Sequence, residues 1–228
     1  MEFDQSSFNQ FVLDNKVIGF FEKPITLKSG RTSHFYVNWR VPTSDAYLLD
    51  ITAAHVAAAA QQLGADCIYG VPEGATKLGV IASLRLARMS HLFGAGSHVI
   101  PMGRAKPKEH GHPKDRYFVG EPAGKTVVLE DVTTTGGSLI ETIDKLIGAN
   151  IDVIAAVTLT NRMEKRDDGL SVEQAILDRY KGKVKYVALS RADELLPMLI
   201  LRDKPAEHIV AELKKEFEQY GVQPLALQ

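Results

Sequence analysis

The sequence lacks several features that would mark a secreted, membrane or nucleic-acid-binding protein. No apolar run approaches the roughly 20 residues of a membrane span, and residues 1–5 lack the basic start and apolar core of a signal peptide. The charges nearly balance, with 27 Lys and Arg against 28 Asp and Glu, which argues against nucleic-acid and membrane-surface partners. The one cysteine, Cys67, lies among apolar residues, so we expect a buried small side chain and not a nucleophile. These absences predict a reduced, cytoplasmic protein of enzyme size.

What the sequence does contain is an alternation of strand and helix patterns along most of its 228 residues, enough for one well-buried domain. We expect helices over residues 6–16, 45–63, 76–89, 137–149, 172–180 and 203–220, with Ser6 or Ser7 capping the first. We expect strands to begin near Cys67, Ser97, Thr126, Ile151 and Val184. This alternation predicts an α/β fold with a doubly wound, mainly parallel sheet that helices cover on both faces.

Residues 19–27 and 32–39 differ from the rest, because they have the pattern of two β segments around a turn. We interpret them as a hairpin outside the main sheet. The expected organisation is a single domain over residues 1–228. It has an N-terminal helix and hairpin hood over about 1–40, an α/β core over about 45–200 and a C-terminal helix over about 203–228.

The most informative segment is residues 127–138, where a buried-strand pattern leads through a loop of small residues into a helical pattern. Such a loop is an anion site, because its free backbone N–H groups and the helix dipole both face the incoming charge. Glu130 and Asp131 stand at the carboxyl end of the strand, where ionised carboxylates accept hydrogen bonds from sugar hydroxyls. Together these features indicate a ribose phosphate ligand. The alternative is an ordinary strand–turn–helix connection with two solvated acids.

This segment resembles the signature of the type I phosphoribosyltransferases, which bind 5-phosphoribosyl-1-diphosphate (PRPP). The resemblance implies that the acidic pair holds the ribose hydroxyls and that residues 134–138 cradle the 5-phosphate, with Thr134 also near the base. The PRPP-binding residues expected in this segment are Glu130, Asp131, Val132, Thr133, Thr134, Thr135, Gly136, Gly137 and Ser138.

A second segment, the loop over residues 103–117, is rich in cationic donors suited to a diphosphate. Up to residue 116 it has no apolar residue larger than Ala or Pro to anchor it, so we expect it to be mobile. A loop of this length in an α/β domain is typical of a lid, although a solvated surface loop is the alternative. Like residues 70–77, 130–131 and 161–162, it follows a predicted strand. The carboxyl ends of parallel strands meet at one rim, where ligands bind.

The spacing of Arg104, Lys108 and His110 in this loop resembles the catalytic loop of the orotate phosphoribosyltransferases, and residues 28–33 resemble the hairpin motif of that family. The resemblance implies Mg²⁺-dependent transfer of the 5-phosphoribosyl group from PRPP to orotate. This reaction of pyrimidine biosynthesis yields orotidine 5′-monophosphate and diphosphate. The expected catalytic residues are Arg104, Lys108, His110 and Asp131, of which the three loop residues close over the diphosphate. The expected orotate-binding residues are Lys28, Tyr36, Thr134 and Arg162, and PRPP is also expected to contact Lys28 and Lys77.

The chain departs from the family pattern at three positions. Glu130 stands where Asp is frequent, which keeps the charge. Ala105 replaces a common Lys, so one diphosphate cation is missing unless Lys106 takes its role. Gly74 also stands where Lys is common, and Lys77 either binds the diphosphate or is a helix lysine that faces water.

The resemblance further implies that Mg²⁺ is held through PRPP, with no direct protein ligand. It also implies a homodimer whose loop closes over the partner subunit's PRPP, with closure over the same chain's site as the open alternative. Two other functions stay open: a phosphoribosyltransferase for a purine or uracil, and a regulator that senses PRPP on the same fold without catalysis. The loop and hairpin motifs disfavour the first, and the intact loop cations disfavour the second.

Overall fold

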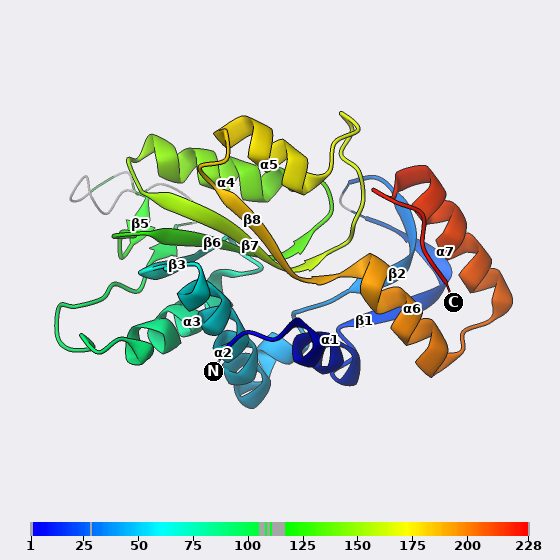
Figure 1. Cartoon of the computed structure of the whole chain (residues 1–228), viewed down its shortest axis with the longest axis horizontal. Helices are drawn as coiled ribbons and strands as arrows, with labels where there is room; N and C mark the ends of the chain where they lie inside the picture. The colour runs from blue at the N-terminus through cyan, green and yellow to red at the C-terminus, as the bar shows by residue number, and fades with distance from the viewer. Residues whose placement is uncertain (1, 28, 105–107, 109, 111–116, 228) are drawn as a thin grey trace.

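The computed structural model describes residues 2–27, 29–104, 108, 110 and 117–227, and within them the chain forms an α/β fold (Figure 1). Its main sheet has the strand order β3-β6-β7-β8, and all neighbouring strands run parallel. These strands are β3 (Cys67–Gly70), β6 (Thr126–Thr133), β7 (Val153–Asn161) and β8 (Lys185–Arg191). The predicted parallel sheet is therefore confirmed.

Helices cover both faces of this sheet, as predicted (Figure 1). α2 (Ala46–Gln62) and α3 (Thr76–Met89) lie on one face, and α4 (Gly137–Gly148) and α5 (Val172–Tyr180) lie on the other. Side chains along β6 alternate between the two faces. Val127 and Leu129 belong to the hydrophobic core on the α2 and α3 side, whereas Val128 belongs to the core on the α4 and α5 side. A strand with apolar residues on both faces therefore carries the acidic pair near its carboxyl end.

The N-terminal segment forms the expected hairpin outside the main sheet. α1 (Gln5–Asp14) leads into β1 (Ile18–Thr26), which pairs with β2 (Thr32–Val37) in an antiparallel ladder. A 3₁₀ turn, η1 (Pro42–Ser44), then connects the hairpin to α2. α7 (Glu207–Tyr220) packs against the hairpin, where the rings of Phe35 and Phe217 stack with their centroids 6.1 Å apart. The C-terminal helix thus fixes an element from the other end of the chain.

Two predictions about the first half of the chain are wrong. Within the described ranges no parallel strand begins near Ser97, because this residue closes a turn in which its Oγ accepts the N–H of Gly94 at 3.0 Å. The next paired segments, β4 (Met102–Gly103) and β5 (Phe118–Val119), form a separate antiparallel pair. The cap of α1 is Asp4, not Ser6 or Ser7, because its Oδ1 accepts the N–H of Ser7 at 2.7 Å.

The helix expected over residues 203–220 is present, but the structure holds another helix before it that was not predicted. α6 (Ala192–Asp203) contains Pro197, which disguises its helical pattern, and it ends where Lys204 adopts a φ of 46°. α7 begins only after Pro205, whose nitrogen cannot donate a hydrogen bond. The predicted burial of Cys67 is confirmed, since it is 1% exposed and burial raises the pKa of its thiol. No helix of the described part is both long and apolar enough to cross a membrane.

Candidate active site

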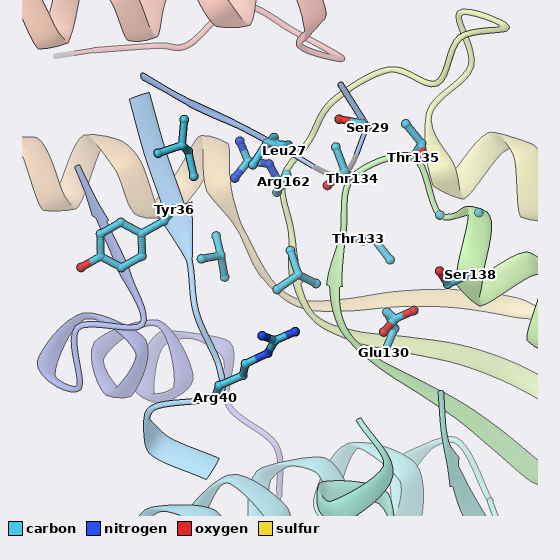
Figure 2. Close-up of a pocket in the computed structure, with 15 residues that line it drawn as sticks. Leu27, Ser29, Tyr36, Arg40, Glu130, Thr133, Thr134, Thr135, Ser138 and Arg162 are labelled. Atoms are coloured by element: carbon cyan, nitrogen blue, oxygen red, sulfur yellow. The ribbon is translucent and has the colours of Figure 1, made fainter. Parts of the chain in front are cut away.

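A pocket of about 630 Å³ lies between the hairpin and the carboxyl-terminal ends of β6 and β7 (Figure 2). Its walls come from the hairpin, from the end of β6 with the loop into α4, and from the residue that follows β7. The predicted site residues that line it are Tyr36, Glu130, Val132, Thr133, Thr134, Thr135, Gly136, Gly137, Ser138 and Arg162. The fold therefore brings the hairpin and the loop before α4 to one site, as the sequence motifs suggested.

The loop before α4 forms an open anion site. Gly136 precedes the helix with a φ of 70°, a left-handed conformation that favours glycine. No side chain of the described residues caps this helix, and the first donor of its hydrogen-bond ladder is the N–H of Ile140, 2.9 Å from Gly136 O. The N–H groups of Gly137 and Ser138 thus precede the ladder, where they and the helix dipole attract an anion.

Two contacts from outside the pocket hold this loop in place. The Nη1 of Arg166 donates to the carbonyl oxygen of Thr135 at 2.6 Å. The hydroxyl of Thr133 lies 2.8 Å from that of Tyr186, and Thr133 is 1% exposed. Thr133 therefore uses its side chain inside the protein, and its expected contact with PRPP stays a prediction. Sequence reasoning missed Arg166 and Tyr186, because no motif marks residues that support a loop from behind.

The acidic pair divides between the pocket and an adjoining cleft of about 880 Å³. Glu130 is buried and lines the pocket, whereas Asp131 is half-buried and lines the cleft. The Oδ1 of Asp131 accepts the N–H of Val132 at 2.8 Å. Both carboxylates border the space beside the phosphate loop, where they can accept hydrogen bonds from sugar hydroxyls. Across the described residues, no three His, Cys, Asp or Glu side chains are grouped as metal ligands.

The loop after β3 explains the glycine at position 74. A Cβ on Gly74 would lie 2.6 Å from the Oδ2 of Asp131, so any side chain there would force the carboxylate to shift. Glycine therefore lets this loop approach the acidic pair. Lys77, in the first turn of α3, is exposed and lines neither the pocket nor the cleft. Its expected contact with PRPP stays a prediction.

Arg162 reaches the pocket wall, but its guanidinium is committed to the protein. The residue is 2% exposed, and its Nε donates to Glu164 Oε1 at 2.7 Å. Its Nη2 donates to Ser33 Oγ at 2.8 Å and to Glu216 Oε1 at 3.4 Å. Its Nη1 donates to Phe35 O at 3.4 Å, and the group lies over the Phe35 ring. With four of its five N–H groups paired in this way, Arg162 has little left to offer a ligand.

The carboxylates that hold Arg162 also bind the hairpin. Glu164 Oε2 accepts from Arg31 Nη1 at 3.1 Å, and Glu216 Oε2 accepts the N–H of His34 at 3.0 Å. Burial raises the pKa of Glu216, an effect that the charge of Arg162 partly opposes. We call this group the buried cluster, and its members are Arg31, Ser33, Arg162, Glu164 and Glu216.

The hairpin side of the pocket presents three polar side chains, Ser29, Tyr36 and Arg40 (Figure 2). The Tyr36 ring packs against that of Phe21, with 5.0 Å between the centroids, at the edge of the pocket. Arg40 follows β2 and points into the pocket on the side of Glu130. Sequence reasoning missed Arg40 because the β pattern ends at residue 39. The available signal was a cation directly after the second β segment.

The loop residues that the structure describes lie apart from this pocket. Arg104 lines a separate pocket of about 460 Å³ beside α4. Lys108 and His110 are exposed and line none of these cavities. The expectations for Lys28, for Ala105 and Lys106, and for the mobility of the loop fall on residues outside the described ranges. The closed arrangement of the loop therefore stays a prediction.

Sequence comparison places the chain among known enzymes, although no protein-family model matches it. It is 28% identical over 220 residues to the orotate phosphoribosyltransferase of Marinobacter nauticus, an alignment that covers 96% of this chain and 98% of that one. It is 33% identical over 152 residues to the orotate phosphoribosyltransferase of Bradyrhizobium diazoefficiens, which covers 63% of this chain and 76% of that one. The chain belongs to the orotate phosphoribosyltransferase family. The members of this family are pentosyltransferases.

Structural comparison agrees on the fold. The crystal structure of the orotate phosphoribosyltransferase of Francisella tularensis matches with a TM-score of 0.67 and 23% identity over 94% of this chain and 99% of that one. The orotate phosphoribosyltransferase fold thus accounts for the parallel sheet with its hairpin at the N-terminus.

Proposed function

We propose that this protein is an orotate phosphoribosyltransferase, which transfers the 5-phosphoribosyl group of PRPP to orotate and releases diphosphate. The observation that carries the proposal is one pocket in which an uncapped helix N-terminus stands beside buried Glu130. A phosphate needs the helix N–H groups and sugar hydroxyls need a carboxylate acceptor, so the pocket offers both halves of a ribose phosphate. Membership of the family supports the same reaction and its place in pyrimidine biosynthesis.

Each part of the pocket has a role in this reaction. Residues 134–138 bind the 5-phosphate, and Glu130 and Asp131 accept hydrogen bonds from the ribose hydroxyls. Orotate lies between the ribose and the hairpin, with expected contacts to Lys28, Tyr36, Thr134 and Arg162. Loss of diphosphate builds positive charge on the ribose ring and negative charge on the leaving group. Catalysis therefore consists of holding the reactants in line and neutralising the departing oxygens.

The loop supplies that neutralisation when it closes. Arg104 and Lys108 carry positive charge to the leaving diphosphate, and His110 donates a hydrogen bond or a proton to it. A closed loop also keeps water away from the ribosyl centre, which protects it from hydrolysis. None of these three residues needs to form a covalent bond with the substrate.

Mg²⁺ is the cofactor in this proposal, bound to the oxygens of PRPP. The residues present fit such an ion, because the Asp131 carboxylate borders the cleft beside the pocket and carboxylate oxygens suit Mg²⁺ or its bound waters. When bound, the ion would supply charge neutralisation on the diphosphate. We further propose a homodimer in which each loop closes over the partner subunit's PRPP. A cytoplasmic location stays a prediction from the sequence.

The test is turnover by the purified protein. With PRPP and Mg²⁺ it should convert orotate to orotidine 5′-monophosphate with release of diphosphate, and chelation of the metal should abolish the reaction. Faster turnover of uracil, hypoxanthine or adenine than of orotate would assign a different base. PRPP binding without turnover of any base would instead favour a regulator, and the proposal would then be wrong.

A further inference from the structure

We propose that Arg40 binds the carboxylate of orotate and thereby selects an acidic pyrimidine over a neutral base. The inference rests on the proposed function, because it concerns the base that the same pocket accepts. Four observations carry it: the availability of the Arg40 guanidinium, its place in the pocket, the character of the surrounding wall and the occupation of Arg162.

Arg40 is an available cation. Its backbone N–H donates to Asn38 Oδ1 at 3.1 Å, but its guanidinium makes no hydrogen bond or ion pair with any residue that the structure describes. Most arginines near the site do make such contacts: Arg31 and Arg162 belong to the buried cluster, and Arg166 holds the phosphate loop. An arginine that points into a pocket and has no protein partner is suited to an anionic ligand.

The position of Arg40 in the pocket indicates that its guanidinium contacts the base and not the 5-phosphate. The phosphate group is fixed at the start of α4, and Figure 2 shows Arg40 on the opposite wall, beyond Glu130. A ribose that spans the acidic pair therefore directs its base towards the hairpin. The wall there is formed by Ile25, Leu27 and Val37, whose apolar side chains suit the faces of a planar ring. Among the described residues, the cations that line the pocket are Arg40 and the buried Arg162, which lies beside Leu27 in Figure 2.

The chemistry of orotate matches this arrangement. Its ring is planar and carries one carboxylate, and a guanidinium can bind a carboxylate with two parallel hydrogen bonds. The family resemblance implies that Arg162 contacts orotate. In this structure its guanidinium N–H groups donate hydrogen bonds to Glu164, Glu216 and Ser33. Arg40 is therefore the pocket arginine whose guanidinium is available to the orotate carboxylate, in addition to the expected contact from Arg162. Lys28 lies outside the described residues.

Arg40 also lines the cleft that contains Asp131, so the competing role is contact with the diphosphate of PRPP. Ligands that share a phosphoribosyl group and differ only in the carboxylate separate the two roles. Orotidine 5′-monophosphate and uridine 5′-monophosphate are such a pair. The ratio of their dissociation constants measures the contribution of the carboxylate to the binding free energy, because the two ligands share the phosphoribosyl group.

The experiment is calorimetric titration of the wild type, Arg40→Gln and Arg40→Lys with both nucleotides. Arg40→Gln should weaken binding of orotidine 5′-monophosphate by roughly 10- to 100-fold, the loss expected for a hydrogen-bonded charge pair, and leave uridine 5′-monophosphate nearly unchanged. Arg40→Lys should recover part of the loss, because lysine keeps the charge without the planar fork. Arg88→Gln, which removes an exposed arginine near the far end of α3, is the matched control and should alter neither affinity.

Two results would overturn the inference. Equal weakening of both nucleotides by Arg40→Gln would place Arg40 on the phosphoribosyl part. In a parallel titration with PRPP, weaker PRPP binding at an unchanged ratio of the two nucleotide dissociation constants would place it on the diphosphate. Thermal unfolding of Arg40→Gln at the wild-type temperature excludes a folding defect as the cause of either result. Failure of the proposed function is distinguishable, because then the wild type itself would not turn over orotate.

Discussion

Replacement of Arg162 by methionine should destabilise the protein before any ligand is present. The guanidinium lies between two buried carboxylates, with 2.7 Å from its Nε to Glu164 and 3.4 Å from its Nη2 to Glu216. Methionine keeps much of the side-chain volume but leaves Glu216 without its cation, while Glu164 retains Arg31 at 3.1 Å. The variant therefore tests whether Arg162 is chiefly a structural residue or a substrate ligand.

The expected cost can be estimated from the burial of the partners. Removing one member of a buried ion pair typically costs about 3–5 kcal/mol, because the other charge is left desolvated and unpaired. For a chain of this size each kcal/mol lowers Tm by about 2–4 °C, so the fall should be roughly 6–20 °C. The remaining Arg31 contact with Glu164 favours the lower half of that range.

The pH dependence supplies a second signature. Burial raises the pKa of Glu216 in the wild type, and removal of Arg162 raises it further because a lowering influence is lost. A carboxyl whose folded pKa lies above its unfolded value destabilises the fold when it is ionised, and this penalty shrinks as the pH falls through the folded pKa. The stability gap between wild type and Arg162→Met should therefore narrow from neutral pH towards acid.

Thermal and denaturant unfolding of the ligand-free protein measure both effects. Arg40→Met is the matched control, because this arginine borders the same pocket without a side-chain partner in the described structure, and its Tm should stay near that of the wild type. Glu216→Gln added to Arg162→Met should recover part of the lost stability, since it removes the orphaned charge. An Arg162→Met protein as stable as the wild type at neutral pH would refute the structural role of the cluster.

Further predictions concern the phosphate loop and the subunit arrangement. Gly136→Val should weaken PRPP binding about tenfold or more and orotate binding little, because valine is strained at this φ and its Cβ would meet Val172 at 2.8 Å. Calorimetric titration measures both affinities, and an unchanged PRPP affinity would make the loop a plain structural turn. Arg166→Ala removes the donor that holds the loop, so KM for PRPP should rise more than KM for orotate in steady-state assays; equal changes would contradict this. Fully exchanged mixtures of Lys108→Ala and Asp131→Ala chains should regain roughly a quarter of wild-type activity if loops act in trans, and no regain would contradict the shared site.

Much of the fold could be predicted because its signals are local. The run from β6 through the loop into α4 has a buried-strand pattern, small residues and an amphipathic pattern in sequence order, and each is read within a few positions. The misplaced elements lie where local signals conflict with context. Pro197 hides a helix that packing stabilises, and among the described residues the segment after Ser97 pairs with no strand of the main sheet.

The candidate site shows the same difference between residues with local signals and residues that depend on distant contacts. The phosphate loop and the acidic pair could be located because their chemistry is contained in one segment. The state of Arg162 could not, because its burial depends on Ser33 and Glu216, which lie far from it in the chain. A family motif locates an arginine in the sequence. The charged side chains around that arginine in the fold determine whether its guanidinium can bind a ligand.

The hairpin shows how strongly the site depends on such distant contacts. Its two strands pair only with each other among the described elements, and a two-stranded ribbon is marginally stable alone. It is held by α7, through the Phe217 ring and the Glu216 carboxylate, and by the segment after β7, where Arg31 donates to Glu164. These contacts fix the backbone that leads to Arg40. The buried Arg162 thus supports the wall, and in our proposal Arg40, whose guanidinium has no partner among the described residues, supplies recognition; a single exposed arginine would have to combine both tasks.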